Sequence, residues 1–116
     1  MALQRTKLAD IAYVASSAGS IYANPASTTS VVKGLVLHNT NSTAETVQVY
    51  VVPDSAGSLG TASTANRILN ISLPANDTLL VEFPYSVVLT DTNDSLQAVT
   101  TTGSKVTVLV LGDQDS

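Results

Sequence analysis

The chain has 116 residues and no cysteine, carries a formal net charge of −4 at pH 7, and has charged side chains at only 12% of its positions. This length fits one domain. The lack of cysteine excludes disulfides, thiolate metal sites and thiol nucleophiles. The acidic balance argues against nucleic acid as a partner, because phosphates attract basic surfaces.

The composition favours a subunit whose surface is covered by other proteins in an assembly. Serine and threonine together supply 29 residues and valine another 15, whereas glutamate occurs only at Glu45 and Glu82. Such hydroxyl-rich, weakly charged strands suit dry packing between subunits. The longest apolar runs, such as residues 106–111, are too short to span a bilayer. Asp10 interrupts any apolar run of the signal-peptide kind, so neither a membrane nor a cleaved secretion signal is predicted.

Residues 1–30 are expected to form an N-terminal arm or strand segment that is part of the sandwich or attached to it. Weak strand patterns cover residues 11–15 and 20–23. This segment is predicted to lie across a neighbouring subunit as an added strand or as an arm. Its scattered apolar side chains are candidate partner-binding residues, namely Leu3, Leu8, Ile11 and Tyr13.

The strongest alternation of apolar and polar residues covers residues 31–38 and 45–52. The cluster Asn39–Thr43 lies between them and predicts a turn with local side-chain hydrogen bonds, either in a hairpin or in a connection at the sandwich edge. Tyr50 alternates with valines, so it is expected on the outer face, exposed, and available as a further partner-binding residue.

The same alternation gives the predicted facing of other side chains. Lys33 is in step with the apolar Leu35 and Leu37, and Phe83 is in step with core-facing positions. Pro53 ends one strand, because proline cannot donate to a ladder. The small, polar segment 54–65 is predicted to be a long exposed loop.

The remaining patterns predict short strands separated by turns, followed by a polar tail at residues 113–116. Residues 31–112 are therefore expected to form the core of an all-β, antiparallel β-sandwich of seven or eight short strands, Ig-like or jelly-roll. The predicted later strands are residues 67–73, 78–83, 87–89, 95–100 and 105–111.

No residue pattern of a known catalytic or cofactor site is present. His38 is the only histidine and has no acidic neighbour in sequence, and the serine-hydrolase elbow and phosphate-binding loops are absent. We therefore expect a protein that is not an enzyme and has no cofactor. Asp91 and Asp94 share a turn whose oxygens suit Ca²⁺, but Leu96 and Thr102 occupy the places where an EF-hand needs Gly and Glu. Local Asx-turn hydrogen bonding is the favoured explanation, and ion binding stays open.

A carbohydrate- or receptor-binding module is a less favoured alternative. Sugar binding by small sandwiches relies on exposed aromatic rings. The chain has no tryptophan and only four tyrosines, of which Tyr50, beside the loop 54–65, offers a thin platform.

Several segments resemble the small β-sandwich virion proteins of tailed bacteriophages, a group that includes capsid decoration (cement) proteins and head–tail accessory proteins. The similarity lies in residues 37–53, 66–68, 73–79 and 94–98. It is a pattern of strands and turns across about residues 31–112, and no catalytic or binding residue is transferred from it.

This resemblance implies a virion structural protein, most simply a capsid decoration protein that bridges and stabilises capsid subunits. Its implied partners are the major capsid protein or other virion subunits, and further copies of itself in a homo-oligomer, for which the analogy suggests a trimer. The alternative location is the neck, the tail or a fibre attachment. The implied localisation is the virion, at the capsid surface or the neck and tail.

Overall fold

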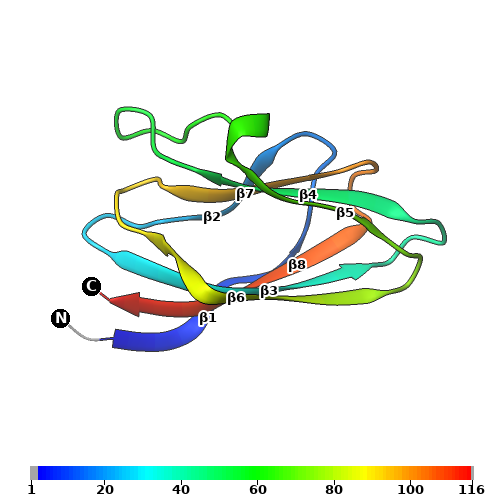
Figure 1. Ribbon diagram of the computed structural model, residues 1–116, viewed down its shortest axis with the longest axis horizontal. Coiled ribbons are helices and arrows are strands. Elements are labelled where there is room, and N and C mark those ends of the chain that lie inside the picture. Colours follow the sequence, from blue (N-terminus) through cyan, green and yellow to red (C-terminus); the bar gives the residue numbers. More distant parts are fainter. Residues whose placement is uncertain (1–2, 116) are drawn as a thin grey trace.

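The computed structural model describes the backbone of residues 3–115 and the side chains of residues 8–115. Eight strands form two four-stranded antiparallel sheets stacked face to face (Figure 1). Sheet A has the strand order β1-β8-β3-β6, and sheet B has the order β2-β7-β4-β5. The elements are β1 Leu3–Tyr13, β2 Gly19–Ala23, β3 Thr29–Asn39, β4 Glu45–Val52, the short 3₁₀ helix η1 Thr64–Asn66, β5 Arg67–Leu73, β6 Thr78–Leu89, β7 Ser95–Thr100 and β8 Val106–Asp115.

The strands pair as one long hairpin rolled on itself. The first strand pairs with the last, β2 with β7, β3 with β6 and β4 with β5, all antiparallel. Two further pairings, β3 with β8 and β4 with β7, join these pairs into the two four-stranded sheets. The predicted all-β antiparallel sandwich is confirmed, and of the two topologies that the sequence left open this pairing order is that of a jelly roll.

The alternating residues of both sheets meet in one core. Strand β4 buries Val47 and Val49, and β3 buries Leu35 and Leu37. The segment Asn39–Thr43 connects sheet A to sheet B, so it is a sandwich-edge connection and not a hairpin. Its local hydrogen bonds are as predicted, since the Asn41 N–H donates to the Asn39 Oδ1 at 2.8 Å.

A chain of buried and partly buried hydrogen bonds links three strands of the sandwich. The Gln114 Nε2 donates to the Tyr22 hydroxyl at 2.9 Å, which lies 2.6 Å from the Ser30 hydroxyl. The Ser30 hydroxyl donates to the Asn24 Oδ1 at 2.6 Å, and the Asn24 Nδ2 donates to the carbonyl of Thr28 at 2.7 Å. Within the described residues no buried side-chain nitrogen or oxygen lacks a partner, so this polar network is compatible with a dense core.

Lys33 is not in step with the core residues, contrary to the alternation. The register shifts between Val32 and Gly34 in the pairings of β3 with both β6 and β8, so Lys33 occupies a bulge. A bulged residue leaves the two-residue period and turns the side chain away. Lys33 is therefore exposed, and its ammonium lies 2.8 Å from the Asp113 carboxylate.

The two ends of the chain also differ from prediction. Residues 3–13 form edge strand β1, longer than the predicted strand at 11–15, and pair with β8 of the same chain. The expected polar tail at 113–116 is, as far as Asp115, the end of β8, paired with β1 and β3. Residues 78–83 and 87–89 belong to one strand, β6, which bulges opposite Lys33.

Across residues 3–115 the only helix is η1, and it has three residues. The described part of the chain thus contains no helix with the length and apolar character that a membrane crossing requires.

Candidate interaction surface

Part of the outer face of sheet B, at β7 and the end of β4, is covered by the chain itself. The loop between β4 and β5, including η1, lies on the outer side of this sheet (Figure 1). Gly60 in the loop accepts a hydrogen bond of 2.9 Å from the Gln97 Nε2 of β7. Gly60 also lies so close to Pro53 and Val52 that an added Cβ would approach the Pro53 carbonyl to 2.4 Å. The loop 54–65 is mostly exposed, as predicted. Through these contacts it also covers part of sheet B, and we call it the lid.

Tyr50 lies beneath this lid, which corrects its predicted exposure. Its side chain leaves the outer face of β4, as the alternation predicts, yet only 8% of the residue is exposed. Its hydroxyl donates to the Gln48 Oε1 at 2.6 Å. The two-residue period correctly predicted the face of β4 from which the Tyr50 side chain projects. It could not predict that a segment about ten residues further along the chain covers that side chain.

Asp94 fixes the start of the lid. Its Oδ1 accepts the backbone N–H of Asp54 at 3.0 Å, and its Oδ2 accepts the N–H groups of Thr90 at 3.2 Å and Asp91 at 3.0 Å. Burial raises the pKa of the Asp94 carboxyl, but these backbone donors outweigh burial, so the net pKa is lowered. The turn is thus organised by its own carboxylate, as the Asx interpretation expects.

Three carboxylates gather at this end of the sandwich. Oxygen atoms of Asp54, Asp91 and Asp94 lie within 4.8 Å of one another. Carboxylate oxygens are the ligands that hard cations prefer. Both oxygens of Asp94 already accept backbone hydrogen bonds, however, which accounts for its position without a cation.

The outer face of sheet A, by contrast, presents apolar side chains to solvent. Val36 of β3 is the register partner of both Leu109 of β8 and Leu80 of β6. Register partners point to the same side of a sheet, and the flanking residues Leu35 and Val110 face the core. Leu109, Val36 and Leu80 therefore form a transverse apolar row on the outside. Leu80 is 69% exposed.

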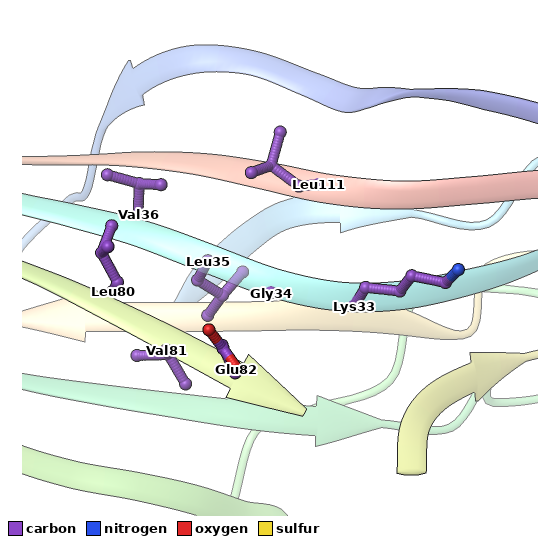
Figure 2. Close-up of a pocket in the computed structure, with 8 residues that line it drawn as sticks. All are labelled: Lys33, Gly34, Leu35, Val36, Leu80, Val81, Glu82 and Leu111. Atoms are coloured by element: carbon purple, nitrogen blue, oxygen red, sulfur yellow. The ribbon is translucent and has the colours of Figure 1, made fainter. Parts of the chain in front are cut away.

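The adjacent row contains a recess. Gly34 of β3 lies between its register partners Leu111 and Glu82. Because Gly34 has no side chain, the surface sinks there into a hollow of about 240 Å³, which we call the β3/β6 hollow (Figure 2). An added Cβ at Gly34 would lie 2.7 Å from the carbonyl oxygen of Val81, so the backbone geometry requires glycine. The hollow is lined by Lys33, Gly34, Leu35, Val36, Leu80, Val81, Glu82 and Leu111.

One charge of each sign borders the hollow. Lys33 is exposed although it pairs with Asp113, whose carboxylate is largely buried. Glu82 is exposed, and among the described residues no hydrogen bond or ion pair engages its carboxylate. Figure 2 shows Glu82, Leu80 and Leu111 beside Gly34, and it shows the Lys33 side chain running along β3 from the rim of the recess.

The candidate residues of the N-terminal segment fall on β1, the other edge of sheet A. Ile11 is 63% exposed and Tyr13 is more than half exposed. Leu8 is half-buried and packs against the core, so the chain itself uses most of its surface. Leu3 begins β1 opposite Asp115, and its side chain lies outside the described residues.

Six exposed apolar residues were not among the candidates from sequence, namely Leu59, Ile68, Leu80, Tyr85, Val88 and Leu111. The signal for Leu80 was present, because Leu79-Leu80-Val81 is an apolar run that breaks the alternation. Tyr85 is almost fully exposed in the bulge of β6, where Ser86 has a φ of 64°. That bulge is set by the pairing with β3, and Pro84 gave its only local hint.

The lone histidine lies on the same outer face. Its Nδ1 is 2.8 Å from the hydroxyl of Thr78, its register partner on β6. The other register partner, Thr107 of β8, has neither a carboxylate nor a thiol. His38 thus pairs with a hydroxyl on an open sheet face, which is a common setting for a surface residue in a sheet.

Comparison with known proteins adds no relative from which a role could be transferred. No protein-family model matches the chain, and no curated protein sequence matches it significantly.

Proposed function

We propose that this protein is a structural subunit of a tailed-bacteriophage virion, and that it decorates the capsid by bridging and stabilising its subunits. The observation that carries the proposal is the unequal cover of the two sheets. The chain covers part of sheet B with its own loop. Of the eight large apolar side chains that are exposed among the described residues, six lie on sheet A, one lies on sheet B and one lies in the loop. Exposed apolar residues grouped on one face are typical of protein–protein contact.

The jelly-roll topology supports this proposal by analogy only, since the fold also occurs in lectins and in cupins. Tyr50, on which a sugar platform would depend, lies under the loop and bonds to Gln48. Because Tyr50 is covered, it cannot serve as the exposed aromatic platform on which the sequence argument for a carbohydrate-binding module rested. A passive, bridging body needs no catalytic constellation, and we propose no enzymatic activity or cofactor.

The edge strand β1 is the contact that we assign to the virion partner. Its outer edge has no strand neighbour among the described residues, since sheet A ends there. A free edge offers backbone N–H and carbonyl groups to a strand of another protein. Ile11 and Tyr13 extend that edge with exposed apolar surface.

The experiment is reconstitution of undecorated particles with purified protein. Removing residues 1–15 would not be a clean test, because it deletes β1 and exposes β8. The double substitution Ile11→Asp with Tyr13→Ser keeps the strand and should lower occupancy on particles by at least about tenfold. Ile68→Asp, at an exposed position of β5 on sheet B, is the matched control and should bind normally.

Imaging of the native particle tests the location. A capsid decoration protein occurs in hundreds of copies, whereas a neck or tail ring holds about six or twelve. A low copy number at the neck would select the alternative location. The absence of this chain from purified particles would refute the whole proposal.

A further inference from the structure

The β3/β6 hollow combines a projection and a recess. Leu80 stands out of β6 with 69% of its surface exposed. One row away, Gly34 forms the floor of the recess between Leu111 and Glu82. A two-fold contact joins the same patch of two copies, so it needs a surface that carries both a shape and its complement. A projecting leucine beside a glycine recess meets that requirement.

The charges at the hollow have the same self-complementary arrangement. An ammonium group has three donors, and the Lys33 ammonium is exposed while it contacts the Asp113 carboxylate. It therefore has donors left for a second carboxylate. Glu82 offers one, since its carboxylate is exposed and unengaged among the described residues. A two-fold axis through the hollow makes the Lys33–Glu82 pair twice.

These features point to a copy of the same chain and not to a partner of one dominant charge. A strongly acidic partner would oppose Glu82, and a strongly basic partner would oppose Lys33. Two copies of a chain with net charge −4 repel one another at long range. Opposite charges at the contact offset part of this repulsion and fix the orientation of the two copies.

We propose that the β3/β6 hollow binds the β3/β6 hollow of a second copy of this chain in a two-fold contact. Leu80 of each copy fills the recess over Gly34 of the other, and Glu82 of each faces Lys33 of the other. This inference deepens the proposed function, because it names the chain itself as a partner at one edge of sheet A and leaves the β1 edge for the virion. It predicts a dimer in place of the trimer suggested by the resemblance.

Sedimentation velocity of the full chain from about 1 µM to about 1 mM tests this contact. The wild-type chain should dimerise within that range. Leu80→Ser should raise the dimer dissociation constant by at least about tenfold, because it removes the apolar side chain that fills the recess. Ile68→Ser is the matched control, since Ile68 is also an exposed aliphatic residue on an edge strand but lies on sheet B.

Glu82→Lys tests the charge arrangement independently of shape. It should weaken the dimer by about tenfold, because two lysines would then face each other, and the loss should shrink in high salt. Both substituted positions are exposed, and circular dichroism melting establishes that each variant is folded. A chain that stays monomeric up to about 1 mM overturns the inference. So does any oligomer, including a trimer, whose stability is indifferent to Leu80→Ser and Glu82→Lys.

Particle reconstitution with the same variants separates this inference from the proposed function. A monomeric chain that still decorates particles would refute the two-fold contact and leave the virion role standing. If that monomer lost particle binding on Leu80→Ser, the hollow would be a docking site for another virion subunit instead. A dimer with the expected sensitivities that never binds particles would support the contact and refute the virion role.

Discussion

The Oε1 atom of Glu45 accepts a hydrogen bond of 2.8 Å from the backbone N–H of Thr102, 57 positions further along the chain. Its Oε2 accepts a second, of 2.9 Å, from the side-chain amide of Asn41. Glu45 is only 2% exposed, so one carboxylate joins two connections at one end of the sandwich. Asp94 has the corresponding position at the other end, because it precedes β7 where Ser95 pairs with Val52 at the far end of β4.

Replacing Glu45 with glutamine should lower the free energy of unfolding by about 1–2 kcal/mol, because charge-assisted hydrogen bonds become neutral ones and one donor loses its acceptor. Urea denaturation followed by circular dichroism measures this change. The chain offers a matched control in its only other glutamate. Glu82→Gln should change stability by less than about 0.5 kcal/mol, and equal effects of the two substitutions would contradict the role of Glu45.

Acid should destabilise the protein through the same carboxylates. Burial raises the pKa of Glu45, but the backbone N–H of Thr102, the amide of Asn41 and the charge of Lys105 together lower it below its ordinary value of 4.5. The pKa of Asp94 is likewise lowered below 3.8. The unfolded chain then binds more protons than the folded chain, so these two groups stabilise the fold above their unfolded pKa values and lose that contribution as pH falls through their folded values.

The measurement is the free energy of unfolding as a function of pH at constant ionic strength. It should decline as pH falls below about 4.5, and the decline should be shallower for Glu45→Gln, which has one shifted carboxyl fewer. Parallel profiles for the variant and the wild type would show that Glu45 keeps its ordinary pKa in the folded state.

Tyr22→Phe should cost about 1–3 kcal/mol, because it removes the central hydroxyl of the chain of hydrogen bonds from Gln114 to Ser30. The buried Ser30 hydroxyl and the partly buried Gln114 amide each lose one partner. The matched control is Tyr13→Phe at an exposed position of β1, with an expected change of less than about 0.5 kcal/mol. Thermal or urea unfolding distinguishes the two, and an unchanged midpoint for Tyr22→Phe would contradict the role of the buried network.

The sequence predicted the strands where a two-residue period is unbroken. Residues 45–52, 67–73 and 95–100 have the predicted bounds. Burial largely follows the alternation in β4 and β5, whereas β7 is buried on both faces. Prediction failed where a distant partner decides. Lys33 leaves the alternation because both neighbouring strands shift register there. The longer β1 was missed because two register shifts against β8 break its pattern.

The candidate surface was less predictable than the fold, because the exposure of an outward side chain depends on whether another segment of the chain lies over it. Tyr50 has the predicted facing but lies under a loop. Leu80 alternates with Leu79 and Val81 and therefore faces outward, and it is exposed because no loop of the described chain lies over that face of sheet A. Whether a loop covers the outer face of a sheet depends on how the whole chain packs. It therefore cannot be predicted from a few neighbouring residues of the sequence.

The loop that covers sheet B contains a two-residue hairpin whose sequence can be improved. Ser55 and Ser58 exchange backbone hydrogen bonds of 2.7 and 3.0 Å, and the two central residues, Ala56 and Gly57, have φ values of 50° and 85°. Positive φ at both positions is what a type I′ turn requires, and asparagine followed by glycine is its preferred sequence. Alanine in the left-handed region costs about 1–2 kcal/mol, part of which asparagine avoids.

Ala56→Asn should therefore raise the free energy of unfolding by up to about 1 kcal/mol. Ala56→Pro is the opposing variant, because proline fixes φ near −65° and excludes the observed conformation. It should loosen the lid over Tyr50, which near-ultraviolet circular dichroism and faster amide exchange of Gly60 and its neighbours would report. If both variants left stability and exchange unchanged, the hairpin would play no part in holding the loop over sheet B.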